Sequence, residues 1–291
     1  MTNNKKFILP IFLLIIISVG LIIFLYFYNP VKNLKVNFLD VGQGDAILIQ
    51  TPYDQNILID GGDMDAKILR QLPKFMPFWD KEIDLMIVSH PHDDHVGGLV
   101  KVVKRYQVNK ILYTGVTHNS PAYLAWLEAV RDKNIEVVII DRPQIITLGE
   151  DLKIEILYPF ESLLNVEVNN LNNSSIVAKL IYKNNSFLFT GDAEKEIEQE
   201  LLGQEINLSA DVFKAGHHGS ITSNSEEFLE EVKPDYVVIQ VGEDNDFGHP
   251  SLRTLKRFER LGAEIYRNDL DGWVQVVSDG EKVEIIKENY R

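Results

Sequence analysis

The sequence predicts an α/β (α+β) protein that is built as a four-layer αββα sandwich and is preceded by one N-terminal transmembrane helix. Three observations lead to this prediction. An apolar segment opens the chain, short runs rich in Val, Ile and Leu follow it as a meander, and helical patterns fall between the later runs. Two mixed sheets packed face to face, with helices outside, accommodate that order. No repeat, low-complexity tract or long polar linker divides the remainder, so we expect residues 34–291 to form one domain.

The composition excludes several classes of protein. With 45% hydrophobic and 25% charged residues the chain can bury a sizeable core, unlike a disordered or collagen-like protein. The absence of cysteine excludes disulfides, thiolate zinc fingers, iron–sulfur clusters and a cysteine nucleophile, so any metal must use His, Asp or Glu. The net charge of −14 argues against a broad basic surface for nucleic acid.

The N-terminal segment is expected to be a membrane anchor. Residues 7–28 carry no charge, and at 1.5 Å per residue they are long enough for a hydrocarbon core of about 30 Å; residues 1–6 form a short tail. A buried core helix is rarely apolar all round for so long, and no small-residue cleavage site for a signal peptide follows. Lysines flank both ends, and the short tail favours a cytoplasmic N-terminus, which makes this a single-pass membrane protein with an extracytoplasmic catalytic domain.

The remaining elements follow from β-rich runs and capping signals. Helix starts are marked by Ser120-Pro121 and by Ser251, which opens a helix whose apolar stripe comprises Leu252, Leu255, Phe258 and Leu261 and which Gly262 ends. The strand candidates are residues 35–39, 46–50, 56–59, 84–88, 136–140, 153–157, 176–182, 187–189, 235–241 and 273–277.

One segment carries four potential metal ligands within six residues. His90-Pro-His92-Asp-Asp94-His95 lies where an apolar strand ends and a helix begins. In an extended loop His90 and His92 point to the same side, while Asp94 and His95 can aim at a second point nearby. The alternative, a solvated loop, fits isolated histidines better than these, because six of the seven histidines fall in three short motifs. The segment therefore predicts two adjacent metal ions.

Three later motifs add candidate residues. Asp192 follows a buried strand at a small turn and could bridge two cations, although taken alone it fits a helix N-cap better. His217 and His218 follow another strand, and we expect one to complete the second metal site and the other to face substrate. His249 precedes the Ser251 helix, where it could hold or protonate an anionic oxygen or be a plain loop residue. His118 lies outside every motif and is expected at the surface.

These motifs resemble the metallo-β-lactamase superfamily, whose fold is the αββα sandwich. Further segments resemble the hydrolase domain of the DNA-internalisation competence proteins of the ComEC type, and together they cover most of residues 34–275 in order: Phe38 to Ala46, Ile59 to Gly62, Thr190 to Ala193, Gly216 to Ser220 and Gly248 to Pro250. The resemblance implies two divalent cations. Their ligands would be His90, His92, Asp94, His95, Asp192 and one of His217 and His218, of which His218 is preferred.

The resemblance also implies roles around the ions. Asp94, His249 and His217 are expected in catalysis, Asp60 behind the metal loop, Asp45 at the edge of the site, and Asn173, Ser174 and Ser220 in supporting or substrate-contacting positions. Many relatives supply a third histidine to the first ion, where this chain has residues 169–175, rich in Asn and Ser. Water or a weak amide or hydroxyl ligand would replace it, which allows either zinc or manganese.

The predicted function is that of a membrane-anchored metal-dependent phosphodiesterase, a nuclease on DNA. The chain departs from the competence proteins in a second way, because those carry this domain within a many-helix membrane protein. We expect that this chain cannot itself form a channel. A membrane channel partner is left open, as is the oligomeric state. The alternatives are a hydrolase of small phosphodiesters such as phosphorylcholine esters of the cell envelope, and a metal-binding accessory without catalysis. A lactamase or lactonase is disfavoured by the Gly-His-Pro and Gln-Gly-Asp elements.

Overall fold

A computed structural model describes residues 5–27, 33–65, 67–164, 166 and 168–288. The chain divides into two units, residues 1–32 and residues 33–291. The first contains helix α1 (Lys5–Phe27), with Pro10 inside it; the first four residues of the predicted tail lie outside the described residues. A bilayer span needs about 20 consecutive apolar residues. Among the described residues no helix is long and apolar enough to cross a membrane, so the transmembrane anchor expected over residues 7–28 is not supported.

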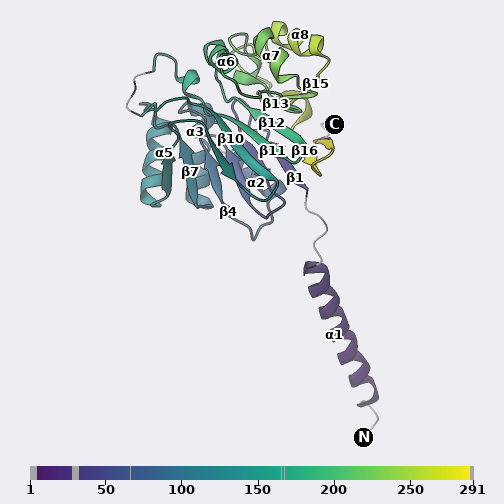
Figure 1. The fold of residues 1–291 in the computed structure, drawn as a ribbon. Coiled ribbons are helices and arrows are strands. Elements are labelled where there is room, and N and C mark those ends of the chain that lie inside the picture. Colours follow the sequence, from purple (N-terminus) through teal and green to yellow (C-terminus); the bar gives the residue numbers. More distant parts are fainter. Residues whose placement is uncertain (1–4, 28–32, 66, 165, 167, 289–291) are drawn as a thin grey trace. The chain divides into compact units, whose positions relative to one another are not determined.

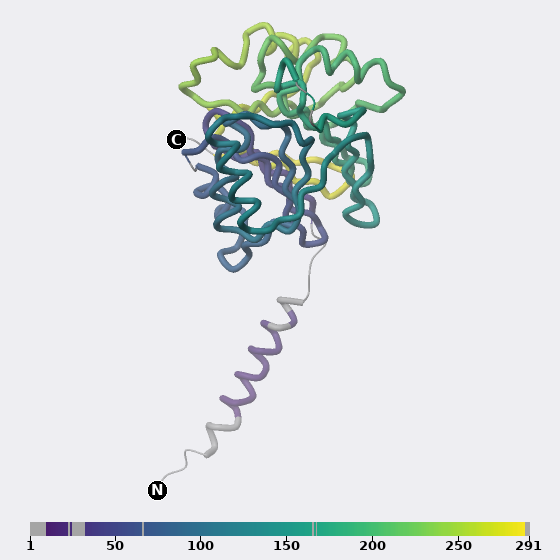
Figure 2. Tube along the Cα trace, turned by 90° about the vertical axis from the view of Figure 1, so that its left-hand side faces the viewer, coloured from purple at the N-terminus to yellow at the C-terminus, as the bar shows by residue number. Residues whose placement is uncertain are grey.

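The second unit contains two large sheets. The first has eight strands in the order β17-β16-β1-β2-β3-β5-β7-β8, so the last two strands of the chain return to pair beside the first (Figure 2). Strands β3, β5, β7 and β8 run parallel to one another. The bounds are β1 Leu34–Phe38, β2 Ile47–Gln50, β3 Asn56–Ile59, β5 Leu85–Ile87, β7 Lys110–Tyr113, β8 Glu136–Ile139, β16 Val274–Ser278 and β17 Val283–Lys287.

The second sheet has seven strands in the order β15-β14-β13-β12-β11-β10-β9, of which β12 to β15 are parallel. A further pair joins β4 (Glu82–Ile83) to β6 (Gln107–Val108). The bounds are β9 Gln144–Thr147, β10 Leu152–Tyr158, β11 Val177–Tyr182, β12 Asn185–Phe189, β13 Val212–Lys214, β14 Tyr236–Ile239 and β15 Glu264–Arg267.

Three apolar layers hold these elements together. The layer between the sheets contains inward side chains of both, such as Phe38 and Phe187. The outer face of the first sheet packs against α2, α4 and α5, with Trp126 fully buried, and that of the second against α6, α7 and α8 (Figure 1). The helices are α2 Ile68–Phe75, α3 Asp93–Val96, α4 Leu99–Arg105, α5 Pro121–Asp132, α6 Lys195–Leu202, α7 Glu226–Val232, α8 Leu252–Leu261 and α9 Asn268–Asp271, with 3₁₀ turns η1 Leu171–Ser174 and η2 Gly216–Gly219. This is the expected αββα sandwich.

The capping predictions are confirmed, and the predicted stripe of α8 is buried only in part. Ser120 accepts a hydrogen bond from the backbone N–H of Tyr123, and α8 ends at Gly262, whose φ is 77°. Within the predicted stripe of α8 only Phe258 is fully buried, whereas Leu252 is 77% exposed. Leu252 is the first residue of the helix, where the chain enters from the surface, so the period of the pattern does not guarantee burial there.

The burial of Phe258 leads to a stability prediction. Its ring packs against Phe213, with the centroids 6.4 Å apart. Because Phe258→Ala leaves a cavity, we expect it to lower the free energy of unfolding by about 3–5 kcal/mol in urea titrations. The matched control Leu252→Ala removes an exposed side chain and should change this free energy by less than about 0.5 kcal/mol. Equal effects of the two substitutions would contradict this packing of α8.

Candidate metal centre

The candidate residues come from loops that follow parallel strands of both sheets. His90 and His92 follow β5, and Asp94 and His95 lie on the short helix α3. Asp192 follows β12 and the pair His217–His218 follows β13. Parallel strands present their carboxyl ends at one edge, which is where open α/β sheets bind ligands. Segments more than 100 residues apart therefore meet at one rim of the sandwich.

One oxygen of Asp192 is the centre of the site. Its Oδ2 atom lies 3.3 Å from His95 Nε2, 3.4 Å from His218 Nε2, 3.8 Å from His217 Nε2 and 4.0 Å from His90 Nε2. Asp192 is 2% exposed. A buried carboxylate oxygen with four imidazole nitrogens within 4.0 Å is suited to be a ligand that two cations share.

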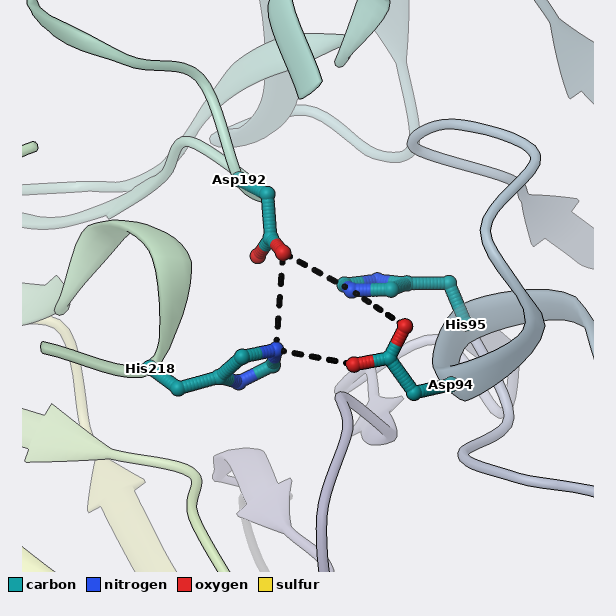
Figure 3. Close-up of side chains that lie close together, drawn as sticks. All are labelled: Asp94, His95, Asp192 and His218. Atoms are coloured by element: carbon teal, nitrogen blue, oxygen red, sulfur yellow. Dashed lines mark ion pairs between the residues drawn. The ribbon is translucent and has the colours of Figure 1, made fainter. Parts of the chain in front are cut away.

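Four side chains form the better-defined half of the site. Potential ligand atoms of Asp94, His95, Asp192 and His218 all lie within 4.8 Å of one another, and Figure 3 shows the four converging. Asp94 Oδ2 is 3.2 Å from His218 Nε2. The buried Nε2 atoms of His95 and His218 have no hydrogen-bond partner, although carboxylates stand nearby. Unpartnered buried nitrogens of this kind fit a metal ion between them.

The other half of the site is formed by His90 and His92. His90 Nε2 lies 2.9 Å from His92 Nδ1, with the two rings nearly perpendicular. Ser89 Oγ is 3.1 Å from His90 Nδ1, on the far side of the ring. This arrangement fixes the His90 ring so that its Nε2 atom points to Asp192 and the neighbouring histidine. The two residues could hold a first ion together with Asp192.

Opposite charges around the site shift the pKa values of its members. Burial acts to raise the pKa of Asp192, but the nearby His218 and His95 imidazoles hold it well below its usual range. Burial acts to lower the pKa values of His95 and His218, yet the charge of Asp192 and of further carboxylates raises both well above the usual value. His90 differs, because burial together with His95 lowers its pKa well below normal.

Asp60 holds the metal-ligand loop from behind. It is fully buried and accepts hydrogen bonds from Ser89 N at 2.8 Å and Ser89 Oγ at 2.6 Å. Its Oδ2 atom is also 2.9 Å from His95 Nδ1, so it fixes the ring with Nε2 facing Asp192. A carboxylate behind a histidine is the usual support of a metal ligand. Asp60 therefore supports the His95 ring and the chain before His90.

Asp45 lies deeper than the expected edge position. It is 2% exposed, its Oδ1 atom is 3.3 Å from His218 Nδ1, and its Oδ2 atom forms an ion pair with Lys214 Nζ. The His218 Nδ1 atom is also 2.8 Å from the Gln240 carbonyl oxygen. The loop before Asp45 needs Gly44, at φ 114°, because a Cβ atom there would overlap the carbonyl of Asp94.

Sequence reasoning missed Lys214. Its side chain is fully buried and also lies 3.8 Å from Asp192 Oδ1, so it places a positive charge behind the central carboxylate. The signal was a lysine inside the otherwise apolar strand Val212–Lys214, directly before the two histidines. A buried lysine without a carboxylate partner is costly, so its presence indicated acids nearby.

His118, expected at the surface, is partly buried and lies beside the site, which its sequence position did not indicate. Its ring centroid is 6.0 Å from that of His92. All seven histidines thus form one continuous chain of neighbouring rings, in the order His118, His92, His90, His95, His218, His217 and His249, with centroids 4.1 to 6.0 Å apart. A residue outside every motif carries no local signal for such a placement.

The remaining predicted residues lie around this group. His249 stacks on Phe247 and lies beside His217, and burial lowers its pKa to about 4. Asn173 Oδ1 accepts a hydrogen bond from Glu194 N at 2.9 Å, and Ser174 Oγ donates to the Leu171 carbonyl at 2.7 Å. Ser220 Oγ lies 3.1 Å from Thr222 Oγ1. In these positions Asn173, Ser174 and Ser220 hold the loops around the site.

Comparison with known proteins agrees with this geometry. Residues 39–243 match the metallo-beta-lactamase superfamily, so the chain belongs to that superfamily. It is similar to ComE operon protein 3 of Bacillus subtilis (28% identity over 274 residues, 87% of this chain and 34% of the relative). It is also similar to Recombination protein 2 of Haemophilus influenzae (30% over 258 residues, 86% and 30%) and to Competence protein ComA of Neisseria gonorrhoeae (28% over 249 residues, 84% and 32%). The chain spans about a third of the length of these relatives.

Solved structures show the same fold at low identity. CmlA, a diiron beta-hydroxylase from Streptomyces venezuelae, has a TM-score of 0.53 at 14% identity, over 89% of this chain and 55% of that one. The metallo-beta-lactamase fold protein YhfI from Bacillus subtilis has a TM-score of 0.51 at 13% identity, over 82% and 97%. These likenesses concern the fold. Membership in the superfamily and the His/Asp cluster together support a divalent-metal hydrolase.

The raised pKa values of His95 and His218 predict a pH-dependent affinity for metal. Only neutral imidazole binds a cation, so protons compete with the metal up to the raised pKa values. Affinity for Mn²⁺ or Zn²⁺, measured by calorimetry, should therefore rise from about pH 6 to about pH 8, with net proton release in buffers of different ionisation enthalpy. Binding without proton release over this range would contradict the assignment of these two ligands.

Proposed function

We propose that this protein is a two-metal phosphodiesterase that cleaves DNA. The observation that carries the proposal is the convergence of four histidine nitrogens on Asp192 Oδ2. Two divalent cations, zinc or manganese, would supply a water of lowered pKa and a clamp for the phosphodiester oxygens when bound there. Relatives named for competence and for recombination favour DNA among the phosphodiesters.

The residues of this chain would have separate roles in binding the cations and the phosphate. His90, His92 and Asp192 would hold the first cation, and Asp94, His95, Asp192 and His218 the second. His249 stands at the opening beside His217, and its pKa of about 4 keeps it neutral at neutral pH. A neutral imidazole can donate one hydrogen bond to a phosphate oxygen without adding charge. We assign this contact to His249.

The nuclease proposal is tested with the full chain and both forms of DNA. With Mn²⁺ or Zn²⁺ the wild-type protein should cleave single- or double-stranded DNA, and Asp192→Asn should lower the rate by about 100-fold or more, because it weakens the ligand that both ions share. Asp132→Asn is the matched control: it removes the same charge from an exposed position on α5 and should leave the rate unchanged. A failure of the wild-type protein to cleave any DNA with either metal would refute the proposal.

A second candidate function is favoured by the surface next to the site. A cavity of about 390 Å³ adjoins Asp94 and is lined by further acids, including Asp63, Asp244 and Asp246, and by Phe247, which is 69% exposed. Carboxylates repel a phosphate backbone but attract a cation, and an aromatic face binds quaternary ammonium groups. These features suit a small phosphodiester with a cationic group, such as a phosphorylcholine ester.

A charge-neutralising variant distinguishes the two substrates. Asp244→Asn/Asp246→Asn should lower KM for DNA and raise KM for p-nitrophenyl phosphorylcholine, because the rim repels one and attracts the other. Steady-state kinetics on both substrates at low salt measures this. The substrate with the higher kcat/KM in the wild-type protein decides between the two functions. KM values that stay unchanged in the variant would show that Asp244 and Asp246 contact neither substrate.

A further inference from the structure

The first-ion half of the site lacks a third nitrogen ligand from residues 169–175. The side chains there are engaged with the protein itself. Asn173 contacts Glu194 N through Oδ1 and Glu196 Oε2 through Nδ2, at 2.9 and 3.4 Å. Ser174 Oγ donates to Leu171, and Ser175 Oγ accepts from Asp192 N at 3.1 Å. This loop therefore positions Asp192 and leaves the third ligand to another segment.

His217 reaches the same oxygen of Asp192 from the other sheet. Its Nε2 atom lies 3.8 Å from Asp192 Oδ2, and His90 Nε2 lies 4.0 Å from the same oxygen. Donor atoms that share one cation stand about 3–4 Å apart when each is about 2.0–2.2 Å from the ion. By this distance His217 is as well placed around the central oxygen as His90.

Contacts behind the ring aim His217 into the site. Its Nδ1 atom is 3.1 Å from Thr222 Oγ1 and 3.4 Å from Glu194 Oε1, and Asn172 Nδ2 holds that carboxylate oxygen at 2.9 Å. A carboxylate behind one nitrogen leaves the other free for a metal, as in the support that Asp60 gives His95. The His217 side chain is 22% exposed, so its free nitrogen is accessible from the opening.

The backbone at the two adjacent histidines gives their side chains different partners. Both are left-handed, with φ 48° at His217 and 52° at His218. Non-glycine residues persist in this conformation where the surroundings over-determine it, which happens most often at functional sites. His218 Nε2 lies near Asp94 and Asp192, whereas His217 lies near Asp192 through Nε2 and near Glu194 through Nδ1, so the turn gives the two rings different partners.

We propose that His217 is the third protein ligand of the first cation, bound through Nε2 and oriented by Glu194 and Thr222. This inference rests on the two-metal centre proposed above and replaces the substrate-facing role expected for His217 from sequence. The rival ligand is His118, whose ring lies beside His92. The ligand class is a divalent cation, zinc or manganese, because the imidazole donors suit zinc and the carboxylate of Asp192 also suits manganese.

Metal counting on the full chain tests the assignment without using activity. His217→Asn is suitable because Asn tolerates the left-handed backbone. After loading with Mn²⁺ and gel filtration, elemental analysis should find about two ions per wild-type chain and about one per H217N chain. The exchange-coupled EPR signal of a manganese pair should be replaced by that of a single ion. His118→Asn is the matched control and should keep both ions.

Each outcome decides the assignment. Two ions in H217N, or a loss in H118N instead, would overturn the role of His217 while leaving the two-metal centre intact. A single ion in the wild-type protein would refute the two-metal centre itself. If H217N does not fold, Glu194→Gln takes its place, since it leaves the His217 turn untouched. A loss of about 10-fold or more in the affinity for one of the two Mn²⁺ ions supports the assignment, and unchanged affinity for both ions overturns it.

Discussion

The site depends on one buried carboxylate and the positive charge gathered around it. Asp192 is nearly inaccessible, and an unpaired carboxylate at that depth would be strongly destabilising. His95 and His218 lie 3.3 and 3.4 Å from its Oδ2 atom, and the Lys214 ammonium lies 3.8 Å from its Oδ1 atom. The nearby carboxylates raise the pKa values of His95 and His218, which favours protons on these two rings. Cations bound at the same place would replace those protons, which couples the chemistry of the site to its electrostatic stability.

The sandwich brings this charge arrangement together from distant segments. Parallel strands in both sheets end at one rim, so the loops after β5, β12 and β13 converge. Tight backbone contacts then fix the loops: Gly44 allows the Asp45 segment to lie on Asp94, and Asp60 bonds the chain just before His90. The acidic cavity beside Asp94 is formed by loops outside this framework. Its carboxylates favour a small cationic substrate over DNA.

Local patterns were sufficient for much of this structure. The spacing of His90, His92, Asp94 and His95 follows from one loop and one helix start, and the caps at Ser120 and Ser251 act within a single turn. Properties that depend on distant neighbours could not be predicted. The support from Lys214 and Glu194 and the position of His118 beside His92 exist only when separate loops meet. The exposure of Leu252 could not be predicted either, since a periodic pattern does not show where the surface begins. The apolar run at residues 7–28 likewise predicted a membrane span that the described residues do not support.

Anomalous diffraction from crystals of the metal-loaded protein tests the central claim most directly. Data at the manganese or zinc absorption edge should show two peaks about 3.5–4 Å apart, on either side of Asp192 Oδ2. One peak should be bounded by His90 and His92 and the other by Asp94, His95 and His218. A loaded protein with no peak at this oxygen, or with ions bound only at the acidic rim, would contradict the account.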